Sequence, residues 1–407
     1  MSAPLFSVII PTRNRGHLLR FALRCVLEQR CGDLEVIVSD NDSTDSTREV
    51  VSEFNDPRIR YVKTPKTLHM PDSWEFALSH ATGRYVTFVS DDDGVSPRLL
   101  EMIHGAVTQS GLDIVAWPFG AIYHHDSCED VELRNTLGIT SRQGRLEEVT
   151  SRSIIAELSA VRFTHSLPRF INSCASADVL ADVRQAFGRV FFPKCPDYSS
   201  GLAQLVVRPA VAYVDDLVLI WGIGKESIGH SQTKGSQASK DFLKELRDDD
   251  ADRTRYVPLQ VYTAMNFAID SLLHIKHLAG DRLAELNIDP LAYYTCVARE
   301  LVSLEHNGLD VSAGFDEMRN ALAKEPPHVR LAITQQFFLV PGGRMLRTAK
   351  ETARSTLLSL KQRWLGPRDD PSGLVQFKGD ANGFSNIYEA ATRLDDLVAP
   401  LRARAVG

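Results

Sequence analysis

Three consecutive carboxylates, Asp91, Asp92 and Asp93, are the residues of this sequence best suited to do chemistry. They follow an apolar run at 85–89, which predicts a buried strand that ends at this point. Neighbouring carboxylates repel one another, and this is costly in a crevice unless a divalent cation or hydrogen-bond donors compensate. Because Mg²⁺ and Mn²⁺ prefer oxygen ligands, often including substrate phosphates, the triplet predicts a metal and diphosphate site. The alternative is a solvated acidic turn before the next helix.

Polar side chains also follow two other apolar runs, at 7–10 and 35–38. The first run leads into Pro11, Thr12 and Arg13, and the second into an acidic and amide-bearing segment at 40–42. In parallel sheets, ligands bind beyond the carboxyl ends of the strands. We therefore expect polar groups from three strand ends to converge on one ligand.

These strand ends belong to a regular alternation of strands and helices. Apolar runs predict strands at 7–10, 35–38, 59–62, 85–89 and 113–117. Helical periodicity and first-turn residues predict helices at 16–29, 45–54, 73–80 and 97–109. The alternation predicts an α/β fold, with a mostly parallel sheet flanked by helices on both faces.

Composition and missing motifs narrow the class of protein. The 407 residues are 43% hydrophobic and 24% charged, which is typical of folded domains, and a net charge of −6 argues against a nucleic-acid partner. The six cysteines form no C-x-x-C pair, and neither a signal-peptide pattern nor a membrane-spanning run is evident, so we expect a cytoplasmic protein. Glycine-rich dinucleotide and Walker A motifs are missing from the sequence. His124 and His125 are interpreted as part of a surface loop rather than as metal ligands.

Five motifs in order resemble the family 2 glycosyltransferases of GT-A fold. They are SVIIPTRNR at 7–15, LEQ at 27–29, SDNDSTD at 39–45, ATGRY at 81–85 and SDDD at 90–93. The similarity is strong over residues 1 to about 118 and weaker to about 235. It implies an inverting transfer of a sugar from a nucleoside-diphosphate sugar donor, with Mn²⁺ or Mg²⁺ at the aspartates.

The resemblance also implies roles for individual residues. Those that would bind the donor nucleotide are Pro11, Thr12, Arg13, Asp40, Asn41, Asp42 and Asp91. Asp92 and Asp93 would hold the metal, with Asp92 as the foremost ligand. Two departures from the family pattern are Asn41, where a second carboxylate is usual, and Ser90, where a carboxylate is common. The identity of the donor base is therefore not specified by these motifs.

An inverting displacement needs a general base that removes the proton of the acceptor hydroxyl. The segment 196–202 is similar to the helix start that carries this base in the family, which implies Asp197 for the role. Its alternative role is a plain helix N-cap, and Asp215 and Asp216 are the reserve candidates. After the last apolar strand, His230 would complete the metal coordination and Lys225 would approach the diphosphate, unless this stretch is a solvated linker.

The rest of the chain has a different pattern. We expect a catalytic domain over residues 1–235 and an all-helical C-terminal domain over 241–407, because apolar residues there recur at helical spacing. The spacing of apolar and basic residues from Arg344 to Trp364 predicts a basic amphipathic helix. It would either bind an anionic membrane on the cytoplasmic side or dock on neighbouring helices. The C-terminal domain would thus contact acceptor, membrane or a second subunit.

The favoured function is a metal-dependent glycosyltransferase that acts on a carbohydrate or lipid-linked acceptor in polysaccharide or glycoconjugate synthesis. A nucleotidyltransferase is one alternative, although the segment Thr12 to Gly16 is a poor version of its basic, glycine-rich loop. A non-catalytic sugar-nucleotide-binding protein is the other. Such a binding protein would have the same motifs at the strand ends but would lack a general base.

Overall fold

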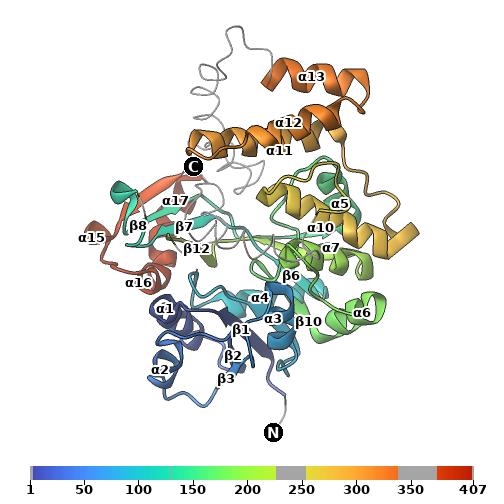
Figure 1. Ribbon diagram of the computed structural model, residues 1–407. Helices are drawn as coiled ribbons and strands as arrows, with labels where there is room; N and C mark the ends of the chain where they lie inside the picture. Colours follow the sequence, from blue (N-terminus) through green and yellow to red (C-terminus); the bar gives the residue numbers. More distant parts are fainter. Residues whose placement is uncertain (1–2, 129, 226–253, 338–373, 406–407) are drawn as a thin grey trace.

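The computed structural model describes residues 3–128, 130–225, 254–337 and 374–405 (Figure 1). The first part of the chain forms an α/β body, and helices of the later part lie above it in the view of Figure 1. The predicted α/β class with a helical C-terminal region is confirmed. Among the described residues, every helix is too short or too polar to cross a membrane. The predicted domain boundary at 235–241 lies outside the described residues.

A large sheet organises the α/β body. Its strands, in spatial order, are β3 (Ile59–Lys63), β2 (Leu34–Asp40), β1 (Phe6–Thr12), β4 (Tyr85–Phe88), β10 (Ser173–Ser176), β6 (Ile114–Ala116), β11 (Ala210–Asp215) and β9 (Arg145–Thr150). Strands β10 and β9 run antiparallel to their neighbours, while the other paired strands are parallel. The mostly parallel sheet predicted from the strand–helix alternation is therefore present. It brings the carboxyl ends of β1, β2 and β4 to one edge.

Both faces of this sheet are buried. Ile9 and Ile37 point to one face, whereas Val8 and Val36 point to the other, as the alternation of side chains along a strand requires. The helices on the first face are α3 (Met70–Leu78), α5 (Ser151–Ser159), α6 (Ala177–Phe187) and α7 (Pro196–Val207). Those on the second face are α1 (Gly16–Leu27), α2 (Thr47–Ser52) and α4 (Leu99–Ser110). The predicted apolar stripe of the first helix is confirmed as its buried face.

A smaller sheet, which the sequence patterns did not predict, adjoins the aspartate triplet. Its strands, in order, are β13 (Val375–Lys378), β8 (Thr136–Ile139), β7 (Ala121–His124), β12 (Leu219–Ile223) and β5 (Gly94–Val95), and a short 3₁₀ turn, η1 (Val131–Leu133), precedes β8. Strand β5 begins immediately after Asp93, so the triplet is held between the two sheets. His124 and His125 are buried at the end of β7, and their assignment to a surface loop was wrong.

The C-terminal region is helical over most of its described length. Its elements are α10 (Ala264–Ala279), η3 (Gly280–Leu283), α11 (Pro290–His306), α12 (Ser312–Leu322), α13 (Pro327–Phe337), α15 (Gly379–Asn382), α16 (Ile387–Thr392) and α17 (Leu394–Ala405). Apolar residues at the helical spacing noted in the sequence are buried along α10, namely Met265, Ala268, Leu272 and Ile275. The expectation of an all-helical region needs one correction, because β13 pairs antiparallel with β8. The amphipathic stretch from Arg344 to Trp364 lies outside the described residues.

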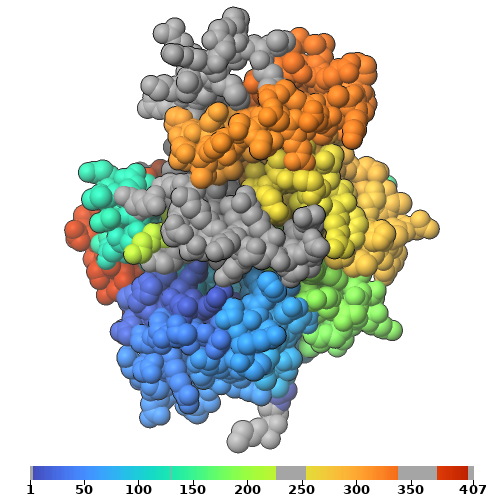
Figure 2. Space-filling view, in the orientation of Figure 1, coloured from blue at the N-terminus to red at the C-terminus, as the bar shows by residue number. Residues whose placement is uncertain are grey.

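The last described segment packs on the α/β body rather than on the helices that precede it. Figure 2 shows it in red beside the teal residues of β8. Ile387 fills the space over Gly94, so that a Cβ on this glycine would lie 2.9 Å from the isoleucine side chain. Tyr388 donates a hydrogen bond to Glu28 at 2.6 Å, and the guanidinium of Arg24 covers its ring. Residues 374–401 thus complete the core on the α1 side of the sheet.

Truncating the Ile387 side chain tests this packing. Because the side chain is 1% exposed, Ile387→Ala is expected to lower the free energy of unfolding by about 2 to 5 kcal/mol. Urea titration followed by tryptophan fluorescence measures it. Leu331→Ala is the control, since Leu331 is 56% exposed and its loss is expected to change stability by less than about 0.5 kcal/mol. Equal stabilities of the two variants would contradict the docking of this segment.

Candidate active site

The ends of β1 and β4 meet around Asp91. These strands are adjacent and parallel, so Thr12, at the end of β1, lies beside the triplet and donates its hydroxyl hydrogen to Asp91 Oδ2 at 2.7 Å. Arg15, just before α1, places Nη1 3.0 Å from Asp91 Oδ1 and 3.6 Å from Asp92 Oδ2. The expected convergence of these two strand ends is therefore present. The guanidinium of Arg15 was not among the residues predicted for the site.

The three carboxylates of the triplet have different surroundings. Burial, more than any other cause, raises the pKa of Asp91, and Asp92 adds to this while Arg15 and Thr12 oppose it. Burial and Asp92 raise the pKa of Asp93 well above its usual range. The backbone N–H of Gly222 opposes this shift by donating to Asp93 Oδ1 at 2.9 Å. The Asp93 side chain thus accepts a hydrogen bond from the backbone of β12.

The backbone of Asp92 is packed between two residues of the small sheet. His125 Nε2 lies 2.9 Å from the carbonyl oxygen of Asp92. A Cβ built on Gly222 would lie 1.7 Å from this oxygen and 2.6 Å from His125 Nε2. Only glycine at position 222 allows β12 to approach the triplet this closely. The position of the aspartates is therefore set by His125, 33 residues after Asp92, and by Gly222 of β12, 129 residues after Asp93.

Filling the space at Gly222 is expected to displace the triplet. The added methyl group of Gly222→Ala would meet backbone and a buried ring, so we expect stability to fall by about 1 to 3 kcal/mol and nucleotide binding to be lost. Thermal unfolding with and without ligand measures both effects. Gly105→Ala is the matched control, because a Cβ there meets nothing within 4 Å and alanine favours a helix. Full ligand-induced stabilisation of Gly222→Ala would refute this account of the triplet's position.

The residues at the end of β2 form hydrogen bonds with neighbouring segments of the chain. Asp40 accepts hydrogen bonds from the Ser43 N–H at 2.7 Å and from the Tyr61 hydroxyl. The Asn41 side chain donates to the Leu68 carbonyl and accepts from the Leu68 N–H, both at 2.8 Å. These bonds fix the 64–69 loop that follows β3. The roles of Asp40 and Asn41 toward a nucleotide stay predictions.

The other predicted nucleotide-binding positions lie at the same edge of the sheet. Pro11 is half-buried in β1, and Arg13 is exposed just beyond its end. Asp42 has a φ of 60° and lies 3.6 Å from the ammonium of Lys63. Lys225 is exposed beyond β12, and His230 lies outside the described residues.

Asp197 lies in the first turn of α7, which begins at Pro196. Cys195, not Asp197, occupies the N-cap position, and its side chain makes no capping hydrogen bond. Burial raises the pKa of Asp197, and the guanidinium of Arg169, with Nη1 4.0 Å from Asp197 Oδ2, opposes the rise. The Asp197 side chain is 18% exposed, so it can reach an external ligand. A carboxyl group with a raised pKa and access to a ligand has the properties of a general base.

A chain of contacts connects Asp197 with the aspartate triplet. The Arg169 guanidinium donates to the Tyr198 hydroxyl at 2.9 Å and lies 4.5 Å from the centre of the Phe119 ring. The rings of Phe119 and Trp221 are 6.5 Å apart, edge to face, and Trp221 precedes the glycine that binds Asp93. This aromatic layer joins the two parts of the site.

The reserve candidates for the base are held in ion pairs. Arg142 Nη1 lies 3.0 Å from Asp215 Oδ1. Arg98 donates to Asp216 at 2.9 Å and also to Asp395 of the C-terminal segment at 2.6 Å. Both carboxylates thus connect elements of the fold through ion pairs that are shorter than the 4.0 Å contact between Arg169 and Asp197, and the role of Asp197 as the base stays a prediction.

The donor set at the triplet fits a magnesium- or manganese-type ion that shares its ligands with a substrate. Within the described ranges, no cluster of three or more His, Cys, Asp or Glu side chains is placed to hold a metal on its own. Two carboxylates with adjacent buried oxygens, Asp91 and Asp92, nevertheless face the same guanidinium. Such a site needs phosphate oxygens to complete the coordination.

The strand order and the polar strand ends define an α/β domain of the kind in which ligands bind at the carboxyl edge of the sheet. Residues 7–163 match the family model described as glycosyl transferase family 2. The predicted resemblance is thereby confirmed.

Curated glycosyltransferases also match part of the chain. One is the GalNAc(5)-diNAcBac-PP-undecaprenol beta-1,3-glucosyltransferase of Campylobacter jejuni, 38% identical over 108 residues, which are 26% of this chain and 33% of the relative. Another is the UDP-Glc:alpha-D-GlcNAc-diphosphoundecaprenol beta-1,3-glucosyltransferase WfgD of Escherichia coli, 35% identical over 98 residues, 24% of this chain and 39% of the relative. The match thus spans between a third and two fifths of these relatives. Among solved structures, S. aureus TarS aligns with a TM-score of 0.44 and 18% identity over 72% of this chain and 52% of that chain.

Proposed function

We propose that the chain is a metal-dependent, inverting glycosyltransferase that moves a sugar from a nucleoside-diphosphate sugar to an acceptor hydroxyl. The observation that carries this proposal is the meeting of Thr12 and Arg15 with Asp91 and Asp92 at the sheet edge of a family 2 segment. These groups provide a hydroxyl, a cation and two carboxylates where a nucleoside diphosphate and its metal would bind.

In the proposed reaction, Asp92 and Asp91 would hold the cation, with Asp93 bound to β12 behind them. The ion would supply positive charge to the departing diphosphate. Arg15 adds a second positive charge beside the same carboxylates. The acceptor oxygen forms its bond to the anomeric carbon as the bond to the diphosphate oxygen breaks with its electron pair, and the hydroxyl proton passes to Asp197. Attack from the side opposite the leaving group inverts the configuration at that carbon.

The acceptor proposed here is a saccharide carried on a lipid diphosphate. Both glucosyltransferases named above have names that specify undecaprenol-linked acceptors, which supports this class of acceptor. The reaction would then take place at the cytoplasmic face of a membrane, in polysaccharide or glycoconjugate synthesis. A peripheral contact through the stretch from Arg344 to Trp364 is part of this proposal.

A ligand screen followed by a reaction tests the function. Thermal unfolding is measured with UDP-, GDP-, dTDP- and CMP-sugars, with and without Mn²⁺, and the sugar nucleotide that stabilises the protein is then incubated with lipid-linked acceptors. We expect metal-dependent stabilisation by one nucleotide class and release of its nucleoside diphosphate. Binding without turnover would support a non-catalytic binder instead, and release of inorganic diphosphate from a nucleoside triphosphate would support a nucleotidyltransferase. Stabilisation by none of these nucleotides would refute the proposal.

A further inference from the structure

The loop between α6 and α7, residues 188–195, leads directly to Asp197 and is held at both of its ends. At its start, Glu75 of α3 accepts the backbone N–H groups of Val190 and Phe191 at 2.5 and 2.7 Å. The side chains of Phe191 and Phe192 are buried in the core on the same face of the sheet. The beginning of the loop is thus fixed to the α/β body.

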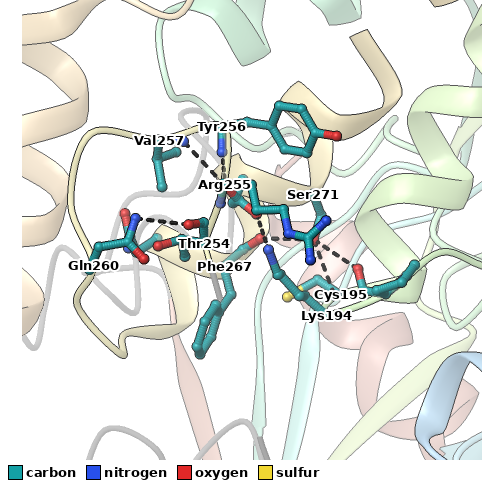
Figure 3. Close-up of polar contacts among 12 residues, drawn as sticks. Lys194, Cys195, Thr254, Arg255, Tyr256, Val257, Gln260, Phe267 and Ser271 are labelled. Carbon is teal, nitrogen blue, oxygen red and sulfur yellow. Dashed lines mark hydrogen bonds and ion pairs between the residues drawn. The ribbon is translucent and has the colours of Figure 1, made fainter. Parts of the chain in front are cut away.

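The end of the loop is fixed to α10 of the helical region. The ammonium of Lys194 forms an ion pair with Asp270 Oδ2, and the backbone N–H of Cys195 donates to Ser271 Oγ at 3.2 Å. Figure 3 shows Lys194 and Cys195 beside Ser271 and the 254–257 backbone. The Lys194 side chain is only 6% exposed, and that of Asp270 is fully buried. A buried ammonium strongly prefers a charged partner, so this pair determines where the loop ends.

Asp270 is held in place by more than the lysine. Its other oxygen, Oδ1, accepts the backbone N–H groups of Arg255, Tyr256 and Val257 at 2.8, 2.6 and 3.2 Å. These hydrogen bonds fix the carboxylate, so it is a rigid anchor for Lys194.

The backbone of Lys194 adopts an unusual conformation at this anchor. Its φ of 78° lies in the left-handed region, which a lysine seldom occupies unless surrounding contacts hold it there. The left-handed residue turns the chain two residues before Pro196, where α7 begins, and α7 carries Asp197 in its first turn. The conformation at Lys194 therefore sets the direction in which the helix start and its carboxylate point.

We infer that Asp270 is a positioning residue for Asp197: through its ion pair with Lys194 it fixes the start of α7 and so the place of the base. This inference rests on the proposed function. It gives the helical C-terminal region a specific task in the reaction, because α10 supplies the anchor. The nucleotide-binding edge does not depend on this anchor, since its contacts come from β1, β4 and β12.

The test separates positioning from simple stabilisation of a buried pair. Asp270→Asn and Lys194→Met each leave one buried charge without its partner, whereas the double variant removes both charges and keeps similar side-chain volumes. Removal of one member of a buried pair is strongly destabilising, but neutral replacement of both members often is not. We therefore expect both single variants to unfold at lower temperature, and the double variant to unfold close to wild type.

Transfer kinetics of the full chain then decide the role. If the pair positions Asp197, kcat of the double variant stays at least about tenfold below wild type, while the donor KM stays within about twofold. Asp182→Asn is the matched control, because it removes the 2.7 Å partner of Arg208 at the other end of α7 and is expected to leave kcat unchanged. A stable double variant with wild-type kcat would overturn the inference, whether or not the single variants fold. Asp197→Asn is measured alongside. Full transfer by that variant would show that Asp197 is not the base, and the inference would fail together with that assignment. A double variant with the full rate would overturn the role of Asp270 alone.

Discussion

Replacing Asp197 by asparagine is expected to lower the rate of sugar transfer by about 10²- to 10⁴-fold, the usual contribution of a general base. The amide has nearly the same shape as the carboxylate but does not take up the acceptor proton. Binding of the nucleotide, measured by thermal unfolding with Mn²⁺, should stay unchanged, because the contacts proposed to bind it lie at the ends of β1 and β4 and not at the start of α7.

The matched control for this experiment is Asp215→Asn. Asp215 is also an aspartate of the second half of the α/β body, but it is paired with Arg142 and is expected to tolerate the change with little loss of transfer. If Asp215→Asn were the inactive variant and Asp197→Asn the active one, the base would be misassigned while the class of reaction would stand.

The pH dependence of transfer gives a second measure of the same residue. The base must be deprotonated to act, and burial raises the pKa of Asp197. Transfer is therefore expected to fall, as pH falls, at a higher pH than an ordinary aspartate would give. Arg169 lowers this pKa, so Arg169→Met should move the acidic limb of the rate profile to still higher pH. An unmoved acidic limb would show that Asp197 does not govern it.

Replacing Asp92 by asparagine is the second change with a large expected effect. Loss of one preorganised electrostatic group at a reacting centre typically lowers the rate by about 10²- to 10³-fold, and here the amide would also weaken the hold on the cation. We expect the stabilisation of the protein by nucleotide to lose its dependence on Mn²⁺. Isothermal titration with Mn²⁺, in the presence of the stabilising nucleotide, measures this directly.

Asp126→Asn is the control for Asp92→Asn. Asp126 is an exposed carboxylate one residue beyond His125. Its replacement changes the net charge near the site by as much as Asp92→Asn does, but leaves the triplet intact. Metal-dependent binding should be retained in Asp126→Asn. Retention of full metal dependence in Asp92→Asn would remove Asp92 from the set of ligands.

The features that could be predicted from the sequence are those encoded locally. The alternating apolar runs and helical stripes predicted β1 to β4 and their helices, because burial on two faces leaves a pattern within a few residues. The convergence of polar strand ends was predicted from the alternation, and the structure realises it as the Thr12–Asp91 contact between the ends of β1 and β4. Asp197 was placed at a helix start from the similarity of its surrounding segment.

The features that could not be predicted depend on contacts between distant segments. Gly222 binds Asp93 across 129 positions, and no local pattern distinguishes it from other glycines in strands. Arg169 and Asp270 are single charged residues within apolar stretches, and their partners are supplied by other elements. The strand β13 is short and pairs with β8 only because the chain returns to the α/β body.

The return of residues 374–401 to the α/β body affects the order in which the protein folds. Ile387 and Leu394 complete the core beneath α1. They come nearly three hundred residues after the aspartate triplet, which this core supports at Gly94. During synthesis, domains ordinarily fold as their residues emerge, from the N-terminal end onward. Here the small sheet lacks its edge strand, and Arg98 lacks Asp395, until residues 374–401 have left the ribosome. The enzyme proposed here would thus acquire its finished donor site only after residues 374–401 have been synthesised.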